Sequence, residues 1–198
     1  MNLPPVRLSE RFRGALDVAA WAHEDQLRKS TNIPYVGHLL AVCALVVEAG
    51  GDEDQAIAAL LHDTLEDQPH KVNEELLRER FGAEVARIVV ACTDTTEVPK
   101  PPWRPRKEAY LATLGHHDER VLLVSLADKL HNATALRRDL EAHGASVWDR
   151  FNAGAPQQLW YLRSLLAIYE QHLQSGPPAA LVRELRDEVA KITDLAGG

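Results

Sequence analysis

The chain has 198 residues, of which 45% are hydrophobic and 26% are charged. These proportions are typical of a globular protein, and the length is sufficient for one domain with one buried core. The formal net charge is −7, which argues against binding along the phosphate backbone of a nucleic acid. A small anionic ligand remains compatible with this charge, because a local basic pocket or a metal ion can act against the overall sign.

The cysteines and the apolar segments indicate a cytoplasmic protein. Cys43 and Cys92 lie in apolar surroundings and belong to no CxxC pair, so we expect free thiols in a reducing compartment. No apolar run approaches the roughly 20 residues that cross a bilayer, and we expect no membrane partner. The N-terminal stretch MNLPPVRLSERFRG also lacks the apolar segment of a signal peptide.

Helical spacing of apolar residues predicts the elements of the first half of the chain. A first helix is expected over residues 8–27, and a second, strongly apolar helix ends at the glycines of residues 50–51. Asp52 then offers an N-cap, and we expect the third helix to continue without a break until Pro69. Two shorter helices follow, the first of them starting after Asn73 and ending at Gly82 and the second reading AEVARIVVACTD.

The second half of the chain is also predicted to be helical. Residues 94–107 contain four prolines and a run of basic residues, and we expect a loop there. A long helix then runs to Gly144, and two further helices begin with prolines in their first turns. No strand pattern is evident. The sequence therefore predicts an all-α fold with one domain over residues 1–198, with a core over about 8–172 and a C-terminal packing helix over about 177–196.

In the segment AALLHDTLEDQPH, an apolar helix is followed by one histidine and three carboxylates within six residues. If the helix is continuous, His62, Asp63, Glu66 and Asp67 lie on one face, because each residue advances by about 100°. The aliphatic residues then lie on the opposite face. A solvated acidic face would have the same pattern, so this segment alone does not distinguish a site from a surface.

Two further polar residues occur on apolar segments. His38 lies at the start of the second helix, and Asp128 follows the aliphatic run VLLVSLA. A lone buried histidine is more often bonded to a backbone carbonyl than to a metal, but a lone buried aspartate is costly unless it is paired. Two histidines and two aspartates could together bind one divalent cation, and mixed imidazole and carboxylate ligands suit Mn²⁺, Fe²⁺ or Zn²⁺.

The pattern formed by His38, His62-Asp63 and Asp128 resembles that of the HD-domain metallophosphohydrolases. The flanking segments AHEDQLRKSTNIPYVGHLLAV, AALLHDTLED, FGAEVARIVVACTD and LVSLADKLHN resemble, in this order, the hydrolase domains of the Rel/Spo alarmone enzymes. They are most similar to those of the stand-alone small alarmone hydrolases. The resemblance covers roughly residues 10–170 and implies a helical bundle with a divalent metal site in its core.

The resemblance implies a role for each site residue. One Mn²⁺ per chain, or Fe²⁺ or another divalent metal, would be bound by His38, His62, Asp63 and Asp128. The catalytic pair would be Glu66 and Asp67, since a carboxylate one turn beyond the ligands can orient and deprotonate a water molecule. A purine nucleotide would be bound by Arg28, Lys29, Ser30 and Asn132, and its 5′-phosphates by basic residues among Lys100, Arg104, Arg106 and Lys107. The expected substrate-binding set therefore includes Lys100 and Arg104.

One departure from the family concerns substrate choice. The family commonly has a threonine where this chain has Ala135, although Thr134 is adjacent. The leading hypothesis is metal-dependent removal of the 3′-diphosphate of (p)ppGpp or (p)ppApp, which releases pyrophosphate and the 5′-phosphorylated nucleoside. The alternatives are another HD-type nucleotide phosphohydrolase, for example one acting on the 2′-phosphate of NADPH, and a catalytically silent alarmone-binding module. A purely structural cluster and the oligomeric state are also left open.

Overall fold

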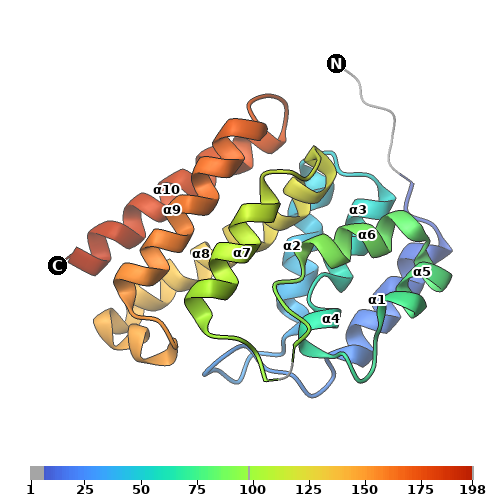
Figure 1. Cartoon of the computed structure of the whole chain (residues 1–198), viewed down its shortest axis with the longest axis horizontal. Helices are drawn as coiled ribbons and strands as arrows, with labels where there is room; N and C mark the ends of the chain where they lie inside the picture. The colour runs from blue at the N-terminus through green and yellow to red at the C-terminus, as the bar shows by residue number, and fades with distance from the viewer. Residues whose placement is uncertain (1–6, 98, 198) are drawn as a thin grey trace.

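The computed structural model describes residues 7–97 and 99–197 and contains no β-strand within them (Figure 1). The predicted all-α class is therefore confirmed for this part of the chain. The first six residues, which include part of the stretch examined for a signal peptide, lie outside the described residues. The helices in chain order are α1 (Glu10–Ala22), α2 (Val36–Glu48), α3 (Glu53–Leu61), α4 (Thr64–Asp67), α5 (Glu74–Phe81), α6 (Ala83–Cys92), α7 (Trp103–Leu114), α8 (Glu119–His143), the 3-10 helix η1 (Gly144–Arg150), α9 (Ala155–His172) and α10 (Pro178–Gly197).

The predicted helix starts at Asp52 and Asn73 are confirmed. The Asp52 carboxylate accepts a hydrogen bond from the Gln55 backbone N–H at 3.0 Å, and the Gln55 side chain accepts one from the Asp52 backbone N–H. This reciprocal capping box starts α3. The Asn73 side chain accepts from the Leu76 backbone N–H at 2.9 Å and starts α5. Such caps are local, which is why the sequence predicts them correctly.

The predicted continuous helix before Pro69 is wrong, because it is interrupted at His62 and Asp63. Helix α3 ends at Leu61, a turn follows, and α4 resumes at Thr64 for four residues. The Thr64 hydroxyl donates to the Leu61 carbonyl at 2.6 Å and so bonds a backbone acceptor at the end of α3. His62, Asp63, Glu66 and Asp67 therefore do not share one continuous helix face.

The predicted loop over residues 94–107 is too long, because α7 begins at Trp103. Pro105 lies in the first turn of this helix. A proline is tolerated there, since the first backbone N–H groups of a helix have no partner within it. Arg104, Arg106 and Lys107 are therefore helical residues, while Lys100 remains in the loop before α7.

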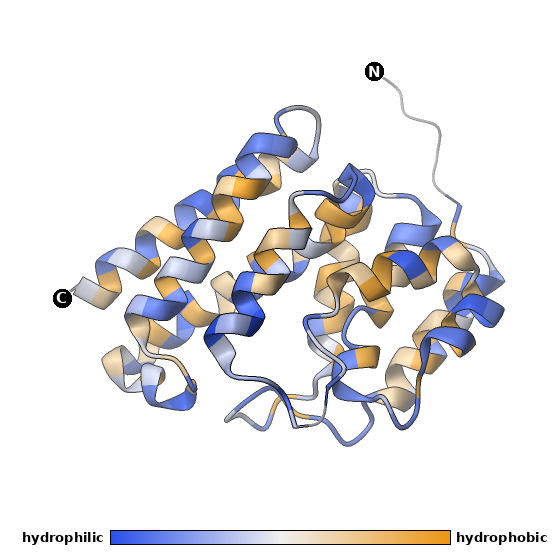
Figure 2. Ribbon diagram, in the orientation of Figure 1, coloured by the Kyte–Doolittle hydropathy of each residue, from blue (hydrophilic) through white to orange (hydrophobic). Residues whose placement is uncertain are grey.

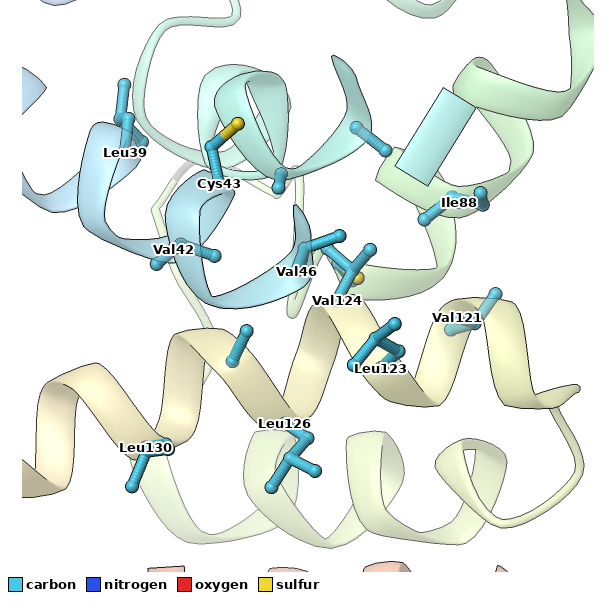
Figure 3. Close-up of a cluster of buried hydrophobic side chains, with 14 of the residues drawn as sticks. Leu39, Val42, Cys43, Val46, Ile88, Val121, Leu123, Val124, Leu126 and Leu130 are labelled. Atoms are coloured by element: carbon cyan, nitrogen blue, oxygen red, sulfur yellow. The ribbon is translucent and has the colours of Figure 1, made fainter. Parts of the chain in front are cut away.

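A large part of the core lies between α2, α3, α6 and α8. Every residue from Ala56 to Leu61 is fully buried. Figure 2 shows apolar residues concentrated on the inward sides of these helices. In Figure 3, Val46 of α2 lies beside Val124 of α8, and both belong with Val42 and Ile88 to one hydrophobic cluster. Both cysteines are buried and free, as predicted.

The C-terminal helices pack on the far side of α8 from this core. Helix α10 contacts both α8 and α9, and Figure 1 shows α9 and α10 side by side. Helix α10 spans residues Pro178–Gly197. None of the helices in the described part of the chain is long and apolar enough to cross a membrane.

Candidate active site

Three predicted metal ligands come together from three separate elements. His38 lies in the first turn of α2, His62 follows the end of α3, and Asp128 lies within α8. Ligand atoms of these three residues all lie within 4.8 Å of one another, and all three residues are buried. The Asp128 Oδ1 atom is 3.2 Å from the His38 Nε2 atom and 3.7 Å from the His62 Nε2 atom.

Asp63, the fourth predicted ligand, lies against the same two histidines. Its Oδ2 atom is 3.0 Å from His62 Nε2 and 3.6 Å from His38 Nε2. This oxygen also accepts a hydrogen bond from the Tyr35 hydroxyl at 2.5 Å, and burial together with Asp63 raises the pKa of Tyr35. We refer to His38, His62, Asp63 and Asp128 as the His/Asp cluster. Tyr35 was not identified from the sequence, because it precedes Asp63 by 28 residues.

The chemistry of the cluster fits a divalent cation. Within residues 7–97 and 99–197, the Nε2 atoms of His38 and His62 are buried and make no hydrogen bond. The Nδ1 atom of His62 is 2.8 Å from the Ala59 carbonyl oxygen, which can only accept. Nδ1 of His62 therefore carries a hydrogen, and Nε2 is the ring atom that faces the carboxylates. Two such nitrogens and two carboxylates are ligands that a borderline metal ion prefers.

The charges within the cluster are strongly coupled. Burial acts to raise the pKa of Asp128, but the neighbouring Lys129 ammonium and the two histidines outweigh it and hold this pKa well below its usual value. Burial likewise opposes the ionisation of Asp63, whose pKa is nevertheless held low, above all by His62. Burial acts to lower the pKa of His62, but the two carboxylates raise it. Both carboxylates are therefore ionised at neutral pH, as cation binding requires.

Glu66 and Asp67, the predicted catalytic pair, form an acidic pair at the rim of the cluster. Their side chains are 19% and 25% exposed, whereas that of His38 is fully buried. The Lys100 ammonium lies 2.8 Å from Glu66 Oε1 and 3.5 Å from Asp67 Oδ1. The Asp94 backbone N–H donates to Glu66 Oε2 at 3.3 Å. The acidic pair thus contacts the loop that precedes α7.

Asp67 is also held by a network that was not identified from the sequence. The Gln26 side-chain NH₂ donates to Asp67 Oδ2 at 2.9 Å. The Gln26 Oε1 atom accepts from the Gln68 NH₂ group at 2.6 Å and lies 2.7 Å from His23 Nδ1. These contacts fix the orientation of the Gln26 amide, so that its donor faces Asp67.

Arg28 and Asn132, two predicted substrate-binding residues, are joined to the cluster. The Arg28 Nη2 atom donates to Asn132 Oδ1 at 2.8 Å, and Asn132 Nδ2 donates to Asp128 Oδ1 at 2.5 Å. The other two predicted residues are more exposed. Lys29 Nζ lies 5.6 Å from the centre of the Phe151 ring, and Ser30 has a left-handed backbone with φ of 59° in the turn before Pro34.

The basic residues around the start of α7 have different partners. Lys100 contacts the acidic pair, whereas the Arg104 guanidinium lies 3.3 Å above the Trp160 ring and bonds to Glu108. Arg106 and Lys107 both pair with Asp94, and Arg106 Nη1 is also 3.7 Å from Glu66 Oε1. The two predicted phosphate-binding residues therefore differ: Lys100 lies at the rim, and Arg104 is engaged with an aromatic side chain.

The sequence comparisons agree with the geometry. The family model for the HD domain matches residues 15–156. The guanosine-3′,5′-bis(diphosphate) 3′-pyrophosphohydrolase MESH1 of Xenopus tropicalis is 39% identical over 127 residues, which are 63% of this chain and 68% of that protein. A Haemophilus influenzae protein named guanosine-3′,5′-bis(diphosphate) 3′-pyrophosphohydrolase is 38% identical over 125 residues. This match covers 60% of the chain and only 18% of the longer Haemophilus protein.

Two solved structures have a similar fold. A metazoan ortholog of SpoT that hydrolyzes ppGpp superimposes with a TM-score of 0.70 and 27% sequence identity. The match covers 95% of this chain and 96% of that one. The protein lmo0812 from Listeria monocytogenes superimposes with a TM-score of 0.65 and 27% identity, covering 81% of this chain and 99% of that one.

Proposed function

The chain belongs to the HD-domain family, and from this premise we propose that it hydrolyses the 3′-diphosphate of (p)ppGpp. The products are pyrophosphate and the 5′-phosphorylated nucleoside. The observation that carries this proposal is the His/Asp cluster, whose two histidine Nε2 atoms are buried, lack hydrogen bonds within the described residues and face two carboxylates. The names of the relatives and of the SpoT ortholog support the same reaction.

We propose one Mn²⁺ per chain, with Fe²⁺ or another divalent metal as alternatives, bound by His38, His62, Asp63 and Asp128. When bound, such an ion polarises a phosphoryl oxygen and makes a water molecule more acidic. The carboxylates of the cluster are held ionised, and a bound cation would take the place of the proton that they favour on His62 Nε2.

The proposed role of the acidic pair is to deprotonate and orient the attacking water. Glu66 is the proposed general base, and Asp67, oriented by Gln26, helps to direct the water toward the 3′-phosphate. Lys100 is 2.8 Å from Glu66, so its ammonium can instead neutralise phosphate oxygens when a substrate occupies the site. We assign Arg28, Lys29, Ser30 and Asn132 to the nucleoside, and Lys100 and Arg104 to its 5′-phosphates.

A further part of the proposal concerns whether the nucleotide carries guanine or adenine. Ala135 has no hydroxyl at a position where the family commonly has a threonine, so we include (p)ppApp as a substrate beside (p)ppGpp. The same departure from the family pattern is the reason for a second candidate function, that of an HD-type nucleotide phosphatase acting on NADPH. We place the activity in the cytoplasm, where free thiols such as Cys43 and Cys92 persist.

Anion-exchange chromatography of reactions with ppGpp, ppApp and NADPH tests the proposed reaction, each with Mn²⁺ and with a chelator. Metal-dependent loss of a 3′-diphosphate from either alarmone supports the proposal, and the ratio of the two rates gives the base preference. Turnover of NADPH alone would instead support the second candidate. No turnover of any substrate by protein that retains bound metal would indicate a binding module.

A further inference from the structure

The candidate ligand His38 contacts a second histidine on its other side. The Nδ1 atom of His38 lies 2.8 Å from the Nδ1 atom of His131, and the two ring centres are 4.9 Å apart. His131 lies in α8, three residues after Asp128, and thus on the helix that supplies another ligand. The two contacting nitrogens come from residues 93 positions apart in the sequence.

Two neutral imidazole nitrogens at this distance share one hydrogen, so that one ring donates and the other accepts. The Nε2 atom of His38 lies 3.2 Å from Asp128 Oδ1, is buried and makes no hydrogen bond within the described residues. If Nε2 is to offer a lone pair to a cation, the hydrogen of His38 must reside on Nδ1. His131 Nδ1 is then the acceptor.

The other histidine of the cluster is held in an equivalent way by a different group. The Nδ1–H of His62 donates to the Ala59 carbonyl oxygen at 2.8 Å, within one turn of its own segment. His38 lies near the start of α2, where its Nδ1 is directed toward α8 instead. A side chain thus provides for His38 the acceptor that the backbone provides for His62.

We propose that His131 is a positioning residue that accepts the Nδ1–H hydrogen bond of His38 and so directs His38 Nε2 toward the metal. The inference rests on the proposed metal site and adds to it a group outside the ligand set. Partners of this kind typically contribute 10–100-fold to metal affinity, because they fix both the tautomer and the orientation of the ligand.

A pair of substitutions separates hydrogen bonding from packing. His131→Asn keeps an acceptor oxygen at the same number of bonds from the backbone as Nδ1, whereas His131→Leu has a similar size and no acceptor. His143→Leu is the matched control, since His143 is an exposed histidine at the end of the same helix. Circular dichroism of each metal-free variant checks that it is folded.

Isothermal titration of the chelator-treated full chain with MnCl₂ measures the affinity. We expect the affinity to fall about 10–100-fold in His131→Leu, to change by less than about threefold in His131→Asn, and to be unchanged in His143→Leu. Wild-type affinity in His131→Leu, or equal losses in the Leu and Asn variants, would overturn the inference.

Because the titration contains no nucleotide, it tests the role of His131 separately from the proposed reaction. A wild-type chain that binds Mn²⁺ but does not hydrolyse ppGpp would contradict the proposed function, while the measured affinities would still decide the role of His131. A wild-type chain that binds no Mn²⁺ would overturn the metal site and this inference together.

Discussion

The His/Asp cluster and the acidic pair are neighbours in the sequence, but the protein holds them in different ways. The side chains of His38 and His62 are at most 2% exposed and are attached to α2 and to the end of α3. Glu66 and Asp67 are 19% and 25% exposed and belong to the four-residue helix α4. His38, His62 and Asp128 are part of the packed core, whereas Asp63, itself 19% exposed, and the acidic pair lie at its edge and are held mainly by polar contacts.

In the proposed mechanism, this difference separates metal binding from proton transfer. The candidate ligands His38, His62 and Asp128 are attached to helices whose aliphatic residues fill the core, so their geometry is set by packing. The acidic pair is oriented by Lys100, by Gln26 and by a backbone N–H of the loop before α7. Substitutions in the cluster should therefore remove the metal, whereas substitutions in the acidic pair should remove turnover and leave the metal bound.

The largest effect is expected for His62→Ala. The variant lacks a ligand, so metal should be absent by elemental analysis and ppGpp turnover should fall below about 1% of the wild-type rate. His70→Ala removes an exposed histidine from the same segment and should change neither quantity. Full metal content in His62→Ala would contradict the ligand assignment.

The next largest effect is expected for Glu66→Gln. The amide keeps the size of the side chain but cannot act as a base, so turnover should fall by at least ~10²-fold. The Mn²⁺ affinity should stay within a few-fold of the wild-type value, because Glu66 is not a ligand. Glu79→Gln, at an exposed position of α5, serves as the control for a lost charge. Loss of the metal together with activity would break the distinction between the two groups.

A smaller effect is expected for Gln26→Leu, which removes the amide that donates to Asp67. A hydrogen bond to a charged group is worth about 1.5 kcal/mol or more, so turnover should fall about tenfold with unchanged metal content. Steady-state kinetics should show the loss in kcat rather than in KM. Unchanged kcat would mean that Asp67 needs no such orientation.

The smallest effect concerns Glu84, which lies outside both groups. Hydrogen bonds from Arg87, together with the charges of Arg87 and Arg120, lower its pKa to about 2. A lowered pKa stabilises the folded state above the ordinary pKa of about 4.5, and this stabilisation is lost as the pH falls through about 2. Because the side chain is 36% exposed, solvent screening should limit the contribution to less than about 1 kcal/mol.

Urea unfolding of wild type and Glu84→Gln at several pH values measures this contribution. The variant should be slightly less stable at pH 7, and the difference should vanish near pH 2. A difference that grows on acidification would have the wrong sign. The measurement also shows whether a loss of activity in mild acid reflects the site or unfolding of the whole chain.

The sequence predicts the residues of the cluster better than the contacts that hold them. His38 and Asp128 are conspicuous because each is a polar residue on an otherwise apolar helix. The hydrogen bonds from Tyr35 to Asp63 and between His38 and His131 join residues 28 and 93 positions apart. Such contacts depend on how the helices pack, and no local pattern encodes them.

The first helix, predicted over residues 8–27, is shorter than expected and ends at Ala22. Local signals explain two other wrong element boundaries. Proline content predicts a loop through residue 107, but Pro105 is compatible with the first turn of α7. The helical pattern around His62 predicts continuity, but a turn separates α3 from α4 there. In both places the residues near the site are affected, because these boundaries determine where Arg106 and Glu66 lie.

The most direct test is the release of pyrophosphate from ppGpp as Mn²⁺ is returned to the chelator-treated protein. The proposed site predicts no product without the ion, a rise that saturates at one Mn²⁺ per chain, and pyrophosphate as the only phosphorus-containing product besides GDP. Turnover that is independent of Mn²⁺, or release of orthophosphate in place of pyrophosphate, would contradict the proposed metal-dependent reaction.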